Sequence, residues 1–266
     1  MDKVHAVPAY RDNYIWLLDG AHGAGGERPV AIVDPGDASP VLQAVGALGL
    51  TPVAMLITHH HNDHIGGIRE IHARYPVPVY GPAQESIPHI SHPLREGDRV
   101  ELPGLPTLEV LDVPGHTAGH IAYIGERFLF CGDTLFAGGC GRLFEGTAAQ
   151  LYSSLQKLTS LPDDTWIYCA HEYTLNNLNF ALAVEPDNPM LQDPLQQDGR
   201  IRHDVRRAAG DVGRGGGWLC AGRPPVAPRT GNICRAAPVE GCLARLNDFR
   251  VAPMIMGVDK KRSPRR

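Results

Sequence analysis

Thr58-His59-His60-His61-Asn62-Asp63-His64 brings four imidazoles and one carboxylate into seven consecutive residues. The stretch follows an apolar run, Val53–Ile57, which has the pattern of a buried strand. It precedes Ile65-Gly66-Gly67, a turn that opens into a helix. Loops at the ends of rigid elements commonly carry reactive groups. Burying so many titratable groups beside a strand is costly unless a metal ion binds them, so the stretch predicts a metal site.

The spacing within this stretch distinguishes the candidate metal ligands from His60. His59 and His61 are two residues apart, and in an extended segment residues i and i+2 point the same way. Both can therefore face one ion, while His60 points elsewhere and is expected to be a structural neighbour. Asp63 and His64 follow after the chain turns. Imidazole nitrogen suits zinc and iron, and a carboxylate can bridge two ions as imidazole cannot.

Four predicted strands each end in a histidine or an aspartate. This pattern indicates a single site at one edge of a sheet, with helices packed on the outer faces. Seven candidate ligands exceed the four of one tetrahedral ion, and they suit two ions with open positions for water. The strands are 53–57, 107–113, 128–131 and 165–169, and the candidate ligands are His59, His61, Asp63, His64, His116, Asp133 and His171.

Hydrophobic periodicity and turn residues predict the remaining elements. Ser39 is the predicted cap of a helix that begins with Pro40, and Thr147 is a predicted cap of a later helix. The proline-rich residues 81–106 are expected to form loops. Further strands are expected at 3–7, 13–19, 30–33, 77–80 and 121–124, and helices at 39–48, 67–75, 147–159 and 173–184.

The other histidines and three cysteines are expected to have structural roles. His120 lies one helical turn beyond His116 and is expected to pack beside the site. Cys131, Cys140 and Cys169 are interpreted as small buried residues. The histidines interpreted as solvated or hydrogen-bonded are His5, His22, His72, His89, His92 and His203.

Composition limits the class of protein. A length of 266 residues indicates one or two domains, and 43% hydrophobic residues can form a substantial core. No run of eighteen apolar residues indicates a transmembrane helix. The first residues lack a signal pattern, so a cytoplasmic location with reduced thiols is expected.

Charge is distributed unevenly along the chain. Residues 1–198 hold 10 of the 25 Lys and Arg and 24 of the 29 Asp and Glu, a balance of −14, which leaves +10 on residues 199–266. A basic tail on an acidic body can indicate an anion-binding segment or a nucleic-acid arm.

Four motifs together resemble the metallo-β-lactamase superfamily and, within it, the glyoxalase II family. The resemblance covers about residues 1–190. It implies an α+β fold, a four-layer αββα sandwich followed by a small C-terminal helical or irregular segment. The first motif is typical of the superfamily, whereas the third and fourth are specific to glyoxalase II. The motifs are Thr58–Gly67, Pro114–His120, Gly132–Arg142 and Ala170–Asn177.

The resemblance also implies how the candidate ligands divide. His59, His61 and His116 would hold one ion, and Asp63, His64 and His171 the other. Asp133 would bridge the two ions, at a position where true lactamases have cysteine, so its carboxylate disfavours lactam hydrolysis. The implied cofactors are two divalent metal ions, with zinc expected first and iron or manganese as alternatives.

The implied activity is hydrolysis of the thioester S-D-lactoylglutathione to D-lactate and glutathione by a metal-activated hydroxide, a step of methylglyoxal detoxification. Asp63 would be a ligand that also assists the hydroxide. Arg142, Phe144 and Tyr173 would line the glutathione site, although Phe144 could instead be a core residue and Arg142 a surface charge. No G-x-S-x-G motif indicates a serine esterase. A monomer without membrane contact is expected.

The expected domains are a catalytic domain at 1–172 and a C-terminal helical domain at 173–266. After about residue 192 the sequence departs from the family, and residues 208–237 are rich in Arg, Gly and Pro. Such composition is typical of a disordered segment or a divergent lid. A nucleic-acid arm is disfavoured, because few aromatic residues are present for stacking. We favour a third interpretation, a reading-frame shift in a GC-rich gene.

Alternative functions follow from the same residues. A hydrolase for another thioester, or a nuclease, would use the same metal site. A folded metal-binding protein with impaired turnover would result if the divergent tail no longer binds substrate. A normal kcat with a raised KM would then indicate lost substrate binding.

Overall fold

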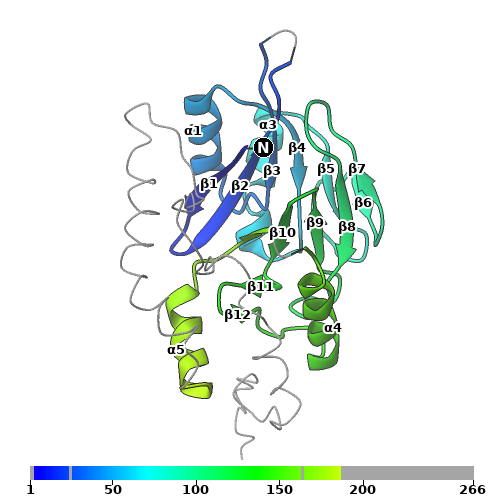
Figure 1. Cartoon of the computed structure of the whole chain (residues 1–266). Coiled ribbons are helices and arrows are strands. Elements are labelled where there is room, and N and C mark those ends of the chain that lie inside the picture. The colour runs from blue at the N-terminus through cyan, green and yellow to red at the C-terminus, as the bar shows by residue number, and fades with distance from the viewer. Residues whose placement is uncertain (1–2, 24–25, 163–164, 187–266) are drawn as a thin grey trace, which may run out of the picture.

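The computed structural model describes residues 3–23, 26–162 and 165–186, and two β-sheets form its centre (Figure 1). In the six-stranded sheet, β1 to β3 pair antiparallel and β3 to β6 pair parallel. Its strands, in spatial order, are β1 (Lys3–Ala9), β2 (Asn13–Asp19), β3 (Pro29–Val33), β4 (Thr51–Leu56), β5 (Val79–Pro82) and β6 (His92–Leu94).

The five-stranded sheet is antiparallel except for the parallel pair β10 and β13. Its order is β13 (Trp166–Cys169), β10 (Phe128–Gly132), β9 (Ile121–Ile124), β8 (Leu108–Asp112) and β7 (Arg99–Val100). A short hairpin, β11 (Leu135–Phe136) and β12 (Gly139–Cys140), follows β10. The helices are α1 (Ala38–Leu48), α2 (Asn62–Ile65), α3 (Ile68–Arg74), α4 (Ala148–Thr159) and α5 (Thr174–Val184).

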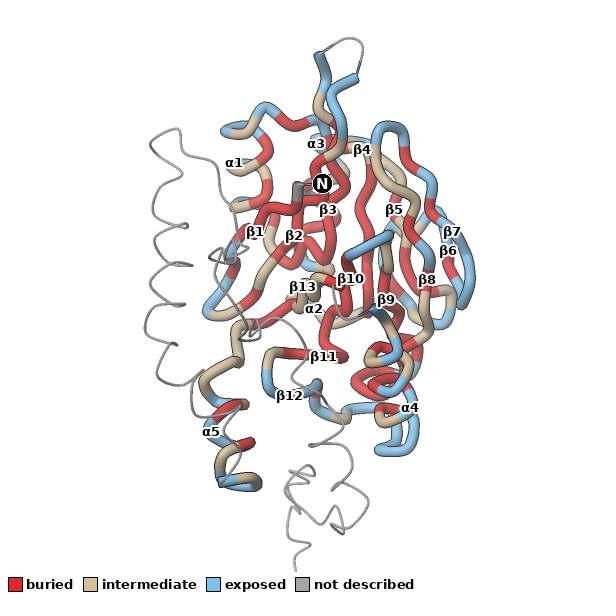
Figure 2. Tube along the Cα trace, in the orientation of Figure 1, coloured by how far each residue is buried: buried red, intermediate tan, exposed pale blue. Residues whose placement is uncertain are grey.

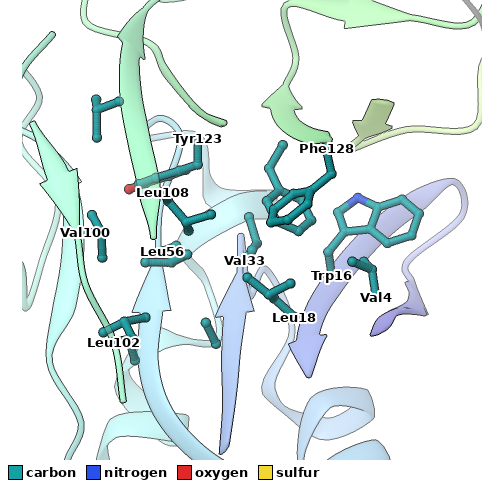
Figure 3. Close-up of a cluster of buried hydrophobic side chains, with 14 of the residues drawn as sticks. Val4, Trp16, Leu18, Val33, Leu56, Val100, Leu102, Leu108, Tyr123 and Phe128 are labelled. Atoms are coloured by element: carbon teal, nitrogen blue, oxygen red, sulfur yellow. The ribbon is translucent and has the colours of Figure 1, made fainter. Parts of the chain in front are cut away.

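The main core lies between the two sheets (Figure 3). Side chains alternate across a strand, so in β4 Ala54 and Leu56 enter this core, while Met55 faces the opposite side. From the other sheet, Phe128 and Phe130 of β10 enter the same core. Figure 2 shows the resulting buried strands at the centre of the molecule.

Helices cover the outer face of each sheet. Val41 of α1 and Ile71 of α3 pack on the outer face of the six-stranded sheet. Leu151 and Leu155 of α4 pack on the outer face of the five-stranded sheet, beside Leu129. The layers therefore run helix, sheet, sheet, helix, which confirms the predicted α+β sandwich.

Several local predictions were wrong. The cap of α1 is Asp37, whose side chain accepts from the Ser39 amide, so the helix begins before the predicted cap Ser39. Pro52 lies inside β4, where the pairing register with β3 shifts. The two- and three-residue strands β6 and β7 lie within the region 81–106, which was predicted to be loop. Cys140 is exposed, whereas Cys131 is buried as expected.

The described residues include the predicted C-terminal domain only as far as residue 186, just after α5. The interpretations of residues 193–266 and of His203 lie outside the described residues and stay predictions, as do the cytoplasmic location and the monomeric state. Within the described part of the chain, no helix is both long and apolar enough to span a membrane.

Candidate metal centre

The seven candidate ligands come together where the ends of strands from both sheets meet. His59 and His61 follow β4, and Asp63 and His64 lie in the helical turn α2 that comes next. The five-stranded sheet contributes the other three, since His116, Asp133 and His171 follow β8, β10 and β13. The prediction of a site at the edge of one sheet was therefore wrong, because the site lies between two sheets.

His59, His61 and His116 form the first group. His61 Nδ1 lies 3.1 Å from His59 Nε2 and 3.0 Å from His116 Nε2. Two nitrogens bound tetrahedrally to zinc, with bonds of about 2.0–2.1 Å, are about 3.4 Å apart. The three nitrogens therefore have nearly the spacing of three ligands on one ion.

Asp63, His64 and His171 form the second group. Asp63 Oδ2 lies 3.4 Å from His171 Nε2 and 3.6 Å from His64 Nε2. Asp133 lies between the groups: its Oδ1 is 3.3 Å from His171 Nε2, and its Oδ2 is 3.2 Å from His116 Nε2. One carboxylate oxygen thus faces each group, which is the arrangement that a bridging ligand requires.

Hydrogen bonds outside the cluster fix the imidazole tautomers. His116 Nδ1 donates to the Arg142 carbonyl oxygen at 2.7 Å, so its Nε2 carries the lone pair. The Thr58 hydroxyl donates to Asp34 and lies 3.0 Å from His59 Nδ1. Because the hydroxyl proton is already used, His59 Nδ1–H must be the donor, and its Nε2 lone pair also faces the cluster. Such outer hydrogen bonds orient metal ligands.

The turn between β1 and β2 orients the second group. Asp12 Oδ1 accepts from His171 Nδ1 at 3.0 Å, which leaves His171 Nε2 to face the cluster. Asn13 Nδ2 donates to Asp63 Oδ2 at 2.9 Å. The turn is also held to the chain after β13, because the Glu172 amide donates to the Asp12 carbonyl oxygen. Neither Asp12 nor Asn13 was predicted from the sequence, since nothing in their local pattern indicates a role at the site.

The pKa values of the imidazoles differ between the two groups. Burial lowers the pKa of His59, His61 and His116, and neighbouring imidazoles lower that of His59 further. Burial also lowers the pKa of His171, but hydrogen bonds to Asp133 and Asp63 outweigh it and raise the pKa to about 10.

The two carboxyl groups are held as carboxylates. The hydrogen bond with His171 contributes most to lowering the pKa of Asp63. Burial raises the pKa of Asp133, but His64 and His171 outweigh it and bring it to about 2. Both groups are therefore ionised at neutral pH.

Two buried atoms at the centre are poorly satisfied. Among the described residues, His64 Nε2 and Asp133 Oδ1 make no hydrogen bond of good geometry, and their contacts are long: Asp133 Oδ1 lies 3.5 Å from His64 Nε2 and 3.3 Å from His171 Nε2. A buried polar atom without a partner is costly, and a cation between these atoms would satisfy both. The donor set of imidazoles and carboxylates fits divalent metal ions.

His60 and His120 lie beside the cluster. His60 contacts Glu85 and Glu145, away from the two groups. The buried His120 stacks on His59, with ring centroids 4.5 Å apart, and its Nε2 accepts from the Asp133 amide. Gly132 lies next to Asp133 with φ +50°, and an added Cβ would lie 2.5 Å from Thr58 Oγ1. These contacts orient the backbone that carries Asp133.

The three predicted substrate residues lie at the rim of the cluster. Phe144 is 59% exposed, and its ring centroid is 5.4 Å from that of His61. The alternative that Phe144 is a core residue is therefore wrong. The Arg142 guanidinium lies 5.8 Å above the Phe144 ring. Tyr173 stacks on His171 at 4.8 Å, so one rim residue lies beside each group.

Residues 13–171 match the model of the metallo-beta-lactamase superfamily. The hydroxyacylglutathione hydrolase of Alkalilimnicola ehrlichii is 60% identical over 198 residues, 74% of this chain and 76% of that protein. The chain belongs to the hydroxyacylglutathione hydrolase family. Another family member, from Nitrosomonas europaea, is 57% identical over 72% of this chain and 71% of its own length.

Solved structures extend the likeness beyond the hydroxyacylglutathione hydrolases. The crystal structure of ETHE1 from Myxococcus xanthus is 32% identical, with a TM-score of 0.54 over 62% of this chain and 76% of that one. The protein TTHA1623, solved in a di-iron-bound form, is 29% identical, with a TM-score of 0.52 over 63% of this chain and 91% of that one. The superfamily and the His and Asp groups together indicate divalent metal ions.

Proposed function

We propose that this protein converts S-D-lactoylglutathione and water to D-lactate and glutathione. The observation that carries the proposal is the pair of ligand groups joined by Asp133, in a chain 60% identical to a hydrolase of this name. In the reaction a carbon–oxygen bond forms at the thioester carbonyl, and the carbon–sulfur bond breaks. The thiolate leaves readily, so no strong general acid is required.

The two groups divide the metal ligands in this proposal. His59, His61 and His116 would hold one ion and Asp63, His64 and His171 the other, with Asp133 available to both. Zinc is the first expected metal, because imidazole-rich sites with a carboxylate suit it. Iron is an alternative supported by the di-iron form of TTHA1623, and manganese is a further one.

When bound, the two ions supply a water of lowered pKa and polarise the thioester carbonyl. The chain supplies orientation. Asp63 is ionised and held by Asn13 at 2.9 Å, so its carboxylate can accept a hydrogen bond from the attacking water and so assist it by orienting it. Asp12 and the Arg142 carbonyl hold the His171 and His116 rings from outside.

The rim residues suit the glutathione part of the substrate. Arg142 offers a cation for a peptide carboxylate. Tyr173 offers a hydroxyl that stays protonated, because burial and the nearby Asp12 raise its pKa to about 12. The exposed ring of Phe144 offers an apolar contact. In this proposal, residues 1–172 form the catalytic domain, and Tyr173 is the first residue of the C-terminal domain.

Steady-state kinetics on S-D-lactoylglutathione, with metal content measured on the same sample, test the proposal. The expected result is two bound ions per chain and turnover that is lost in His59→Ala. The exposed His22 provides a matched control, since His22→Ala should keep full activity. Wild-type protein without bound metal, or unchanged turnover in His59→Ala, would overturn the proposal.

A further inference from the structure

His60 lies between two candidate ligands in sequence but bonds elsewhere. Its Nδ1 lies 3.0 Å from Glu85 Oε2, and its Nε2 lies 3.2 Å from Glu145 Oε1. The Glu85 side chain is only 3% exposed, whereas those of His60 and Glu145 are 33% and 39% exposed. One imidazole therefore connects a buried carboxylate with a carboxylate at the surface.

Both carboxylates also hold the loop that carries His116. Glu85 Oε1 accepts hydrogen bonds from the Thr117 hydroxyl and, at 3.2 Å, from the Gly119 amide. Glu145 Oε2 accepts from the Ala118 amide at 2.9 Å. Every residue from 117 to 119 thus bonds to a carboxylate that also contacts His60.

We propose that His60 is a positioning residue that sets the spacing of the three histidines in the first group. This inference rests on the proposed function, because it assigns those histidines to one ion. His60 is covalently joined to His59 and His61, and its two carboxylates fix the backbone immediately after His116. The network therefore links all three ring positions without using a nitrogen that faces the ion.

The geometry favours this role over a further ion at His60. Residues His60, Glu85 and Glu145 have the composition of a metal site. However, each His60 nitrogen is within hydrogen-bond distance of a different carboxylate, and both carboxylates have backbone donors as well. The polar groups are thus satisfied by one another.

Stepwise metal titration of the metal-free full-length protein tests the proposal. Loss of an outer partner typically weakens metal affinity about 10- to 100-fold. We expect His60→Ala to weaken one of the two zinc equivalents by this factor and to leave the other unchanged. His60→Asn retains a donor near Nδ1 for Glu85, so its loss should be smaller. Excess zinc should restore kcat/KM, and His22→Ala should match wild type in every measurement.

Three results would overturn the proposal. The first is unchanged affinity for both equivalents in folded His60→Ala. The second is an equal loss for both equivalents, since general destabilisation would produce it. The third is an additional zinc equivalent in wild type that disappears in His60→Ala, because His60 would then be a ligand.

The test still gives an answer if His60→Ala does not fold or if the proposed function is wrong. Glu145 is at the surface, so Glu145→Ala provides a second variant if His60→Ala does not fold. It should weaken the same equivalent, and unchanged affinity would count against the proposal. Titration also needs no substrate. Wild-type protein that binds two ions but leaves S-D-lactoylglutathione intact would therefore overturn the proposed function alone.

Discussion

The pKa values of the imidazoles are shifted in opposite directions in the two ligand groups. In the first group, burial keeps the pKa values of His59, His61 and His116 below the usual value for histidine. In the second group, carboxylates outweigh burial and raise the pKa of His171 to about 10 and also that of His64. Metal ions bind the neutral imidazole, so a proton must leave the second group as it is loaded.

One zinc equivalent should therefore show a strong pH dependence and the other little. Between pH 6.5 and 8 the affinity of the second group should rise with pH, about tenfold per unit for each proton displaced. Calorimetric titration in buffers of different ionisation enthalpy would measure the protons released. Asp12→Asn removes one of the carboxylates that raise the pKa of His171, while the larger effects of Asp133 and Asp63 remain, so the pH at which the affinity of the second group stops rising should be lower. Equal pH dependence for both equivalents would contradict this prediction.

The sequence predicted the chemistry of individual residues better than their partners. Spacing alone separated His59 and His61 from His60, and strand ends indicated His116, Asp133 and His171. The partners Asp12, Glu85 and Glu145 could not be predicted, because each meets its histidine only after distant segments come together. Glu85 lies 25 residues from His60, and Asp12 lies 159 from His171.

At the scale of elements, α4 supports the loop that carries His116. Its Ser154 hydroxyl donates to the Pro114 carbonyl oxygen at 2.8 Å, and Leu151 lies against Gly115. The helix begins with a capping box, in which Thr147 and Gln150 exchange side-chain and backbone hydrogen bonds. This start was predicted at Thr147 because threonine is a favoured cap.

Thr147→Ala should therefore lower the free energy of unfolding by about 1 kcal/mol, within a typical range of about 0.5–2. Chemical denaturation would measure the loss. Thr159→Ala is the matched control, because Thr159 is the last, half-buried residue of α4. Among the described residues its hydroxyl donates to the Gln156 carbonyl oxygen within the helix and caps no helix start. A loss in the control as large as that in Thr147→Ala would show that the cap is not the cause.

Long elements with a clear apolar pattern were predicted well, and short ones were not. The hairpin of β9 and β10 and the long helices α1 and α4 lie close to their predicted positions. The strands β6, β7, β11 and β12 have two or three residues each, which is too short for an alternating pattern. They exist because neighbouring chain offers backbone partners, and local sequence does not record those partners.

At the scale of the molecule, the three large apolar clusters lie within residues 4–169. The cluster around α5 is small, with Leu178 and Ala181 as its buried members. Among the residues that the structure describes, the core between the sheets and both outer layers are thus formed before α5 begins. None of the candidate ligands lies after His171.

A variant that ends at Pro186 should therefore fold and bind two metal ions. Thermal unfolding followed by circular dichroism, with metal analysis of the purified variant, would measure both properties against the full chain. A single cooperative transition and two equivalents are expected. Loss of either property would mean that the later residues are part of the folded unit.

The site joins the two sheets at one end of the sandwich, where hydrogen bonds also link them. The Ile121 amide donates to the Thr58 carbonyl oxygen, and the Tyr123 hydroxyl donates to the Ile57 carbonyl oxygen. Four candidate ligands follow β4 of one sheet, and three follow strands of the other. Each bound ion would therefore be held by residues from both sheets and would connect the sheets at this end of the sandwich. The affinity for metal would then depend on the distance between the sheets. A smaller side chain at Leu56, which lies in the core between them, would change that distance and with it the spacing of the ligands. A substitution that touches no ligand could in this way alter the enzyme's metal preference.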